Sequence, residues 1–391
     1  MLLSQTRLIR TVSVPFRPQN GISFYFNGSG FLPIVTPRQS RSLITHSRNK
    51  AGILDFDLVQ PDLNTQPKHT STTASSDITT TTQLKYQIPP IIFLHGLMGN
   101  RKNNRTAARE LSKLLGTSVI VPDLRNHGTS FHLAPHDNES MCNDLILLIN
   151  HLRNDDDALV APQIKSNSTN NESTTIDDSG FIVIGHSMGG KVAMCFALRN
   201  PELVKGVISI DNIPYTNPER SFAEFEKFHI WLNELQWLTE GGGFKGSMAG
   251  LRANLKKVVD SEAILNFLLS NFDKSSGIAA GSGGGSTIVP KVPLKLINSS
   301  IENLIDFKLS TRGDLDKYAP FNDPLLIVRA RYSEFIGRDL HASIIDKRFT
   351  SWEIEDVDSG HWIISEKRKE FIHIASNWIL KKFGNTVTTG N

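Results

Sequence analysis

The stretch Phe181-Ile-Val-Ile-Gly-His-Ser-Met-Gly-Gly190 decides the fold of this 391-residue chain. Its four leading apolar residues predict a buried strand, and Lys191–Leu198 continues as an apolar helix. A serine on the sharp turn between a strand and a helix is a nucleophile elbow, which exposes the hydroxyl at the tip of the turn. The residues two before and two after that serine need almost no side chain, and here they are Gly185 and Gly189. We therefore predict that Ser187 is a catalytic nucleophile.

Apolar strands and amphipathic helices alternate on both sides of this stretch. A long helical pattern, about residues 217–311, precedes the last two strands. This order predicts one α/β domain at residues 53–383, with a mostly parallel sheet, helices on both faces and a helical lid. Three polar or flexible insertions interrupt it, at 60–82, 160–179 and 275–286. The predicted strands are 53–59, 89–94, 118–121, 181–184, 204–210, 324–328 and 350–354, and the predicted helices outside the lid are 105–115, 141–152, 191–198 and 366–383.

A serine nucleophile needs a base, and His361 is the preferred one of the twelve histidines. It lies in Asp358-Ser-Gly-His-Trp362, after the last predicted strand, and the order serine then histidine is that of the α/β-hydrolase arrangement. His95 and His186 sit inside turn motifs, where we expect them to brace loops. Three further histidines match no single helix or strand face, so we predict no metal site: His127, His132 and His136.

Two carboxylates compete for the acid that orients the histidine. Asp211 ends the strand after the elbow, on the same sheet edge, and Pro214 stiffens its loop. In the usual arrangement the acid follows the strand 324–328; here Ser333 takes that position and Glu334 stands beside it. We prefer Asp211, keep Glu334 as the alternative and place Asp339 third.

An oxyanion hole is expected beside Ser187. The backbone N–H of Met188, directly after the nucleophile, supplies one donor. The N–H of Leu97, in the loop His95-Gly-Leu-Met-Gly99, supplies the other.

The first residues have the pattern of a mitochondrial presequence. Seven of the 42 basic residues precede the first acidic one, Asp55, so the rest of the chain has 35 basic against 39 acidic residues. The start is rich in Arg and Ser and amphipathic up to Pro15, which predicts a presequence over about 1–41 and a mitochondrial location. The remainder shows no basic patch for nucleic acid and no apolar run long enough to span a membrane. Cys142 and Cys195 lie in predicted helices and indicate no disulfide framework.

Five motifs occupy residues 95–105, 123–128, 185–190, 209–214 and 359–361. Together they resemble the mitochondrial α/β-hydrolases of yeasts, a group that includes the ethanol acetyltransferases and is related to animal and bacterial esterases. The resemblance covers about 53–383 without the three insertions. Two features depart from the pattern of this group and bear on which alcohol is the acceptor. Tyr215 stands where a small residue is more usual, and the Gly-Ser-rich run interrupts the lid.

The resemblance implies an α/β-hydrolase fold and a triad of Ser187, Asp211 and His361. It also implies acetyl-CoA as a donor substrate, ethanol as acceptor, no cofactor, and esterase and thioesterase side activity. We therefore expect an alcohol O-acetyltransferase that makes ethyl acetate. The alternatives are a mitochondrial carboxylester hydrolase or thioesterase of the same fold, and a non-enzymatic matrix interaction protein. The sequence identifies no protein partner.

Overall fold

The computed structural model describes residues 44–46, 52–61, 85–86, 88–154, 180–216, 218–275, 286–309, 315–337, 339–384 and 386–387. The predicted presequence at 1–41 lies outside these residues, as does most of the predicted insertions at 60–82, 160–179 and 275–286.

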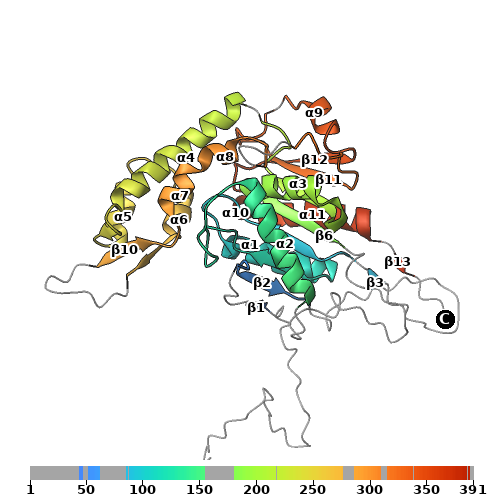
Figure 1. Ribbon diagram of the computed structural model, residues 1–391, viewed down its shortest axis with the longest axis horizontal. Helices are drawn as coiled ribbons and strands as arrows, with labels where there is room; N and C mark the ends of the chain where they lie inside the picture. Colours follow the sequence, from blue (N-terminus) through green and yellow to red (C-terminus); the bar gives the residue numbers. More distant parts are fainter. Residues whose placement is uncertain are drawn as a thin grey trace, which may run out of the picture. The chain divides into compact units, whose positions relative to one another are not determined.

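An eight-stranded sheet forms the centre of the described chain (Figure 1). The last six strands in the spatial order run parallel to one another, and the second strand runs antiparallel to both of its neighbours, so the predicted, mostly parallel sheet is confirmed. In spatial order the strands are β1 (Ile44–His46), β2 (Phe56–Val59), β5 (Val119–Pro122), β4 (Ile91–Leu94), β6 (Phe181–His186), β7 (Val204–Ile210), β11 (Leu325–Ala330) and β12 (Trp352–Val357).

The central strands are apolar on both sides because helices cover both sheet faces. In β4, for example, Ile91 and Phe93 point to one core and Ile92 and Leu94 to the other. The first core is closed by α1 (Arg101–Leu115) and α11 (Arg368–Phe383). The second is closed by α2 (Asn138–Asn154) and α3 (Met188–Arg199). All eight strand positions in β4 and β5 are buried, which holds the loops at their ends in fixed places.

Between β7 and β11 the chain forms the lid, which Figure 1 shows in yellow-green to orange at one side of the sheet. The predicted helical lid also contains three short strands that the sequence did not indicate, and these pair as an antiparallel sheet. The lid helices are α4 (Pro218–Leu238), α5 (Met248–Leu255), α6 (Glu262–Leu269), α7 (Leu294–Ser299) and α8 (Ile301–Ile305), and its strands are β8 (Phe244–Lys245), β9 (Phe272–Lys274) and β10 (Thr287–Pro290).

Other boundaries also differ from the predicted ones. Helix α1 begins four residues earlier than the predicted 105 because Asn100 caps it, accepting from the Lys102 N–H. The predicted first strand is shorter, and β1 precedes it unpredicted at the sheet edge. None of the described helices is long and apolar enough to cross a membrane. The remaining short elements are β3 (Lys85–Tyr86), which pairs with β13 (Thr386–Val387), a 3-10 turn (Pro201–Leu203), α9 (Ala342–Asp346) and α10 (Ile363–Glu366).

Candidate active site

Ser187 lies between β6 and α3 in a backbone conformation that residues other than glycine rarely adopt. Its φ is 53° and its ψ is −115°. Its N–H donates to the Ile210 carbonyl at 2.8 Å, and its own carbonyl accepts from the Asn212 side-chain amide at 3.1 Å. A conformation of this kind costs about 1–3 kcal/mol and persists only where the surroundings enforce it. The end of β7 therefore holds the serine at the tip of the turn.

The glycines around Ser187 are required by close backbone packing. A Cβ on Gly185 would lie 2.1 Å from the Gly189 carbonyl oxygen. A Cβ on Gly189 would lie 2.6 Å from the carbonyl oxygen of His95. Since no real Cβ atom approaches a backbone oxygen so closely, the spacing Gly-x-Ser-x-Gly follows from the geometry of the turn.

His361 and Asp211 meet at the same edge of the sheet. The Nδ1 atom of His361 lies 2.7 Å from Oδ2 of Asp211, and Asp211 is fully buried. The other carboxylate oxygen, Oδ1, accepts from the Ala330 N–H at 3.2 Å. Because a carboxylate only accepts, His361 carries its proton on Nδ1 and leaves Nε2 as the acceptor. Ser187 and His361 line one cavity, so the structure brings together the three residues predicted as a triad.

The two other carboxylates considered for the acid, Glu334 and Asp339, lie on the loop after β11. Glu334 is exposed and lines the cavity, and Asp339 is exposed on the same loop. The hydrogen bond on Nδ1 of His361 belongs to Asp211.

Several neighbours hold the loop that carries His361. The ring of Phe335 stacks on the imidazole, with centroids 4.0 Å apart and planes 21° from parallel. His186 donates from Nε2 to the His361 carbonyl at 2.7 Å, and burial lowers the pKa of His186 to about 3. Glu366 accepts from the Gly360 N–H at 2.8 Å. His361 is thus fixed on its ring face and on both sides along the backbone.

The predicted oxyanion donors lie beside Ser187. Met188 is the first residue of α3, where a helix leaves its N–H groups without intrahelical partners. Leu97 lines the same cavity as Ser187. Its neighbour Gly96 is so close to the elbow that an added Cβ would lie 3.4 Å from the Ser187 Cβ.

Two buried histidines fix the loop of Leu97 through its backbone. His95 accepts from the Leu124 N–H on Nε2 at 3.0 Å and donates from Nδ1 to the Gly96 carbonyl. His127 accepts from the Met98 N–H on Nε2 at 3.0 Å. Burial lowers the pKa of His95 to about 4 and the pKa of His127 to about 3, so both rings are neutral. Their Nε2 lone pairs are used in these bonds.

Acid is expected to destabilise the fold through the neutral histidines His95, His127 and His186. Their folded pKa values of about 4, 3 and 3 lie below the ordinary value of 6.5. Below that ordinary value the unfolded chain binds protons that the folded chain does not. Their contribution to stability is therefore complete at neutral pH and lost as the pH falls toward about 4. Below the ordinary pKa each contributes a slope that approaches about 1.4 kcal/mol per pH unit, and urea unfolding between about pH 6 and pH 5 measures it.

The substitution His127→Gln isolates one of these slopes. Glutamine offers a side-chain oxygen to the Met98 N–H but cannot titrate, so the slope should fall by about 1.4 kcal/mol per pH unit. His373→Gln is the matched control, because His373 is exposed on α11. Equal slopes for the wild type and His127→Gln would show that burial does not hold His127 neutral.

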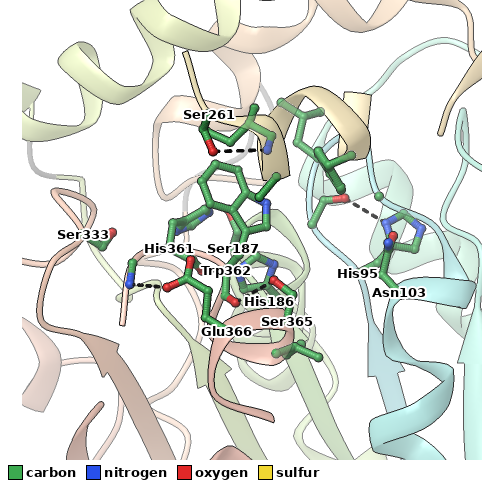
Figure 2. A pocket seen from close by; sticks show the side chains of 18 of the residues that line it. His95, Asn103, His186, Ser187, Ser261, Ser333, His361, Trp362, Ser365 and Glu366 are labelled. Carbon is green, nitrogen blue, oxygen red and sulfur yellow. Dashed lines mark hydrogen bonds between the residues drawn. The ribbon is translucent and has the colours of Figure 1, made fainter. Parts of the chain in front are cut away.

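The cavity at Ser187 has a volume of about 780 Å³ and lies between the sheet domain and the lid. Figure 2 shows His361, His186 and Trp362 with Ser187, and Ser261 from the lid. Lid residues such as Phe228, Trp231 and Phe267 give it an apolar wall. A cavity of this size is large enough for an acyl chain and its leaving group.

Sequence reasoning missed three residues that shape this site. Phe335 stacks on His361, His127 bonds the oxyanion loop, and Asn271 of the lid reaches the same loop. The motif Asp-Leu-Arg-Asn-His-Gly128 marked His127 as notable without giving its role. Nothing in the local pattern marks Phe335 or Asn271, whose partners are distant in sequence.

Comparison with known proteins shows the family to which the chain belongs. A family model described as alpha/beta hydrolase fold matches residues 89–241. A "probable alcohol acetyltransferase" of Saccharomyces cerevisiae is 32% identical over 290 residues, which are 72% of this chain and 74% of that protein. The chain belongs to the α/β-hydrolase family. The predicted resemblance to the yeast acetyltransferases of this family is confirmed.

Other relatives of this α/β-hydrolase carry different names. Ethanol acetyltransferase 1 of Hanseniaspora uvarum is 28% identical and matches 76% of this chain and 81% of its own length. An sn-1-specific diacylglycerol lipase of Xenopus tropicalis is 27% identical and matches 74% of this chain and 78% of its own length. Among solved structures, a marine microorganism esterase has the same fold, with a TM-score of 0.58 and 24% identity over 74% of this chain and 94% of its own. The relatives support an enzyme of acyl transfer or ester hydrolysis.

Proposed function

We propose that this α/β-hydrolase is an alcohol O-acetyltransferase that makes ethyl acetate from acetyl-CoA and ethanol. The observation that carries the proposal is the hydrogen bond of His361 to Asp211 beside Ser187, in a chain related to alcohol acetyltransferases. The chemistry needs side chains and backbone N–H groups alone, with acetyl-CoA as a substrate and no cofactor.

In the first half of the reaction Ser187 is acylated. His361 accepts the Ser187 hydroxyl proton on Nε2 as the oxygen attacks the thioester carbonyl. The N–H groups of Leu97 and Met188 stabilise the oxyanion. When the carbon–sulfur bond breaks, His361 returns the proton to the sulfur and the thiol of coenzyme A leaves.

In the second half an alcohol removes the acetyl group. Ethanol gives its proton to His361 and attacks the acyl-enzyme carbonyl, forming a second oxyanion in the same hole. Collapse breaks the bond to Ser187, which recovers its proton from His361, and the ester leaves. Water in place of ethanol gives acetate, so one site produces transferase and esterase activity.

The second candidate is a carboxylester hydrolase or thioesterase. It is favoured by the diacylglycerol lipase among the relatives and by the cavity of about 780 Å³, which exceeds the space that an acetyl group needs. Under this hypothesis the acceptor is water, and the physiological acyl group is longer than acetyl.

Purified protein given acetyl-CoA, with and without ethanol, decides between these proposals when ethyl acetate and acetate are followed together. We expect ethyl acetate to form with ethanol and to vanish in Ser187→Ala. Acetate alone, or turnover of simple esters alone, would overturn the acetyltransferase proposal in favour of the hydrolase. Absence of Ser187 labelling by a fluorophosphonate on folded protein would instead support the non-enzymatic role.

We also propose that the protein acts in mitochondria, on the basis of the basic, acid-free start before Asp55. Fractionation of cells that express the full chain tests this, with a variant lacking residues 1–41 as the control. Recovery of both proteins from the cytosol would contradict the proposal.

A further inference from the structure

Met98 is held in a strained conformation at the oxyanion loop. The Gly99 N–H donates to the Gly96 carbonyl at 2.9 Å, which closes a turn over these four residues. Met98 takes the third position with a φ of 59° and is fully buried. Glycine is the usual residue with positive φ at this position of a turn, and another residue costs about 1–2 kcal/mol there. The turn therefore needs contacts that hold it.

Two side chains from different parts of the chain supply those contacts. The Met98 N–H donates to Nε2 of His127 at 3.0 Å. The Met98 carbonyl accepts from Nδ2 of Asn271 at 2.8 Å. The peptide planes on both sides of Met98 are thus fixed. The first of them joins Met98 to Leu97 and directly follows the peptide whose N–H is the predicted oxyanion donor.

Asn271 belongs to the lid, between α6 and β9, and is 1% exposed. Its backbone is anchored within the lid, because its N–H donates to Leu268 at 3.1 Å and its carbonyl accepts from Lys291 at 2.8 Å. Its side-chain amide has longer contacts with lid carbonyls, 3.4 Å to Leu268 and 3.5 Å to Phe267. The shortest bond of that amide is the one to Met98, so it ties the lid to the oxyanion loop.

We infer that Asn271 is a positioning residue for the oxyanion hole, through which the seated lid holds the turn that carries the Leu97 N–H. Asn271 touches no reacting atom and acts through Met98. The hole is complete only when the lid segment at Asn271 is in place, which links substrate enclosure to stabilisation of the oxyanion. The inference rests on the serine chemistry of the proposed function and is independent of the acceptor alcohol.

The substitution Asn271→Leu in the full chain tests the inference with p-nitrophenyl acetate. Loss of one aligned oxyanion donor lowers kcat by about 10²- to 10³-fold, so a displaced donor should lower it by about 10- to 100-fold. KM should stay within about twofold, because ground-state binding does not use the hole. The Ki of a trifluoromethyl ketone, which forms a tetrahedral adduct with Ser187, should rise by the same factor as kcat/KM falls.

Two further variants keep the test decisive. Asn271→Asp keeps almost the same side-chain size but places an acceptor opposite the Met98 carbonyl, which is itself an acceptor. It should therefore show the same loss of kcat, and it replaces Asn271→Leu in the test if the leucine variant does not fold. Asn254→Leu is the matched control, because Asn254 lies in the lid and its amide bonds locally, donating to the Gly250 carbonyl at 3.0 Å and accepting from Lys257 at 3.0 Å. It should retain the wild-type kcat.

A purely structural role would give another pattern. Titration with a fluorophosphonate counts the active sites, and wild-type kcat per active site in both Asn271 variants would overturn the inference. An unchanged Ki for the ketone would also overturn it. A wild type that hydrolyses p-nitrophenyl acetate but makes no ethyl acetate would refute the acetyltransferase proposal alone.

Discussion

Replacing Ser187 by glycine is expected to abolish activity and to stabilise the protein. Without the hydroxyl no acyl-enzyme forms, and kcat should fall by about 10⁵- to 10⁶-fold. At the same time the φ of 53° and ψ of −115° cease to be strained, because glycine has no Cβ. The free energy of unfolding should rise by about 1 kcal/mol. Hydrolysis of p-nitrophenyl acetate and urea unfolding measure the two effects.

Ser187→Ala separates the two effects. Alanine removes the same hydroxyl but retains a Cβ in the strained conformation, so it should lose as much activity and gain no stability. A glycine variant with more than about 1% of the wild-type rate would exclude Ser187 as the nucleophile. Equal stability of the two variants would show that the elbow stores no strain. The elbow would then differ from sites that trade stability for activity.

The elbow and the sheet around it could be predicted because their signals are local. Strand β7 has the predicted bounds Val204–Ile210, because β-branched apolar residues at its start, middle and end mark a buried strand. The strand-turn-helix at Ser187 needs specific residues within a few positions. His361 and Asp211 follow from the topology, because parallel strands bring their carboxyl ends to one edge.

The rest depends on contacts between distant residues. The lid strands β8, β9 and β10 have two to four residues each, too few to show alternation, and pair across the Gly-Ser-rich run. Edge strand β1 has three residues. Asn271 meets Met98 across 173 positions, and no local pattern in either segment marks that bond. The sequence could therefore indicate the groups that react, while the residues that position them required the structure.

Asp211→Asn should lower kcat by about 10⁴-fold, the loss seen when such an acid is replaced by its amide. The structure supplies the reason. The Ala330 N–H donates to Oδ1 of Asp211, so an asparagine would keep its oxygen there and turn its NH₂ group toward Nδ1 of His361. Two donors cannot face each other, and the imidazole would shift its proton to Nε2. That tautomer cannot accept the proton of Ser187.

Glu334→Gln is the matched control for this change, because it also turns a carboxylate into an amide on an α/β-hydrolase loop near His361. Glu334 is exposed and lines the cavity, so its substitution should alter KM and leave kcat within about threefold of the wild type. Asp211 is fully buried and is not among the residues that line the cavity, so Asp211→Asn should leave KM almost unchanged. The two variants therefore separate orientation of the base from binding of the substrate. A large loss of kcat in Glu334→Gln with a small loss in Asp211→Asn would exchange the two roles, and the bond between His361 and Asp211 would then serve the fold alone.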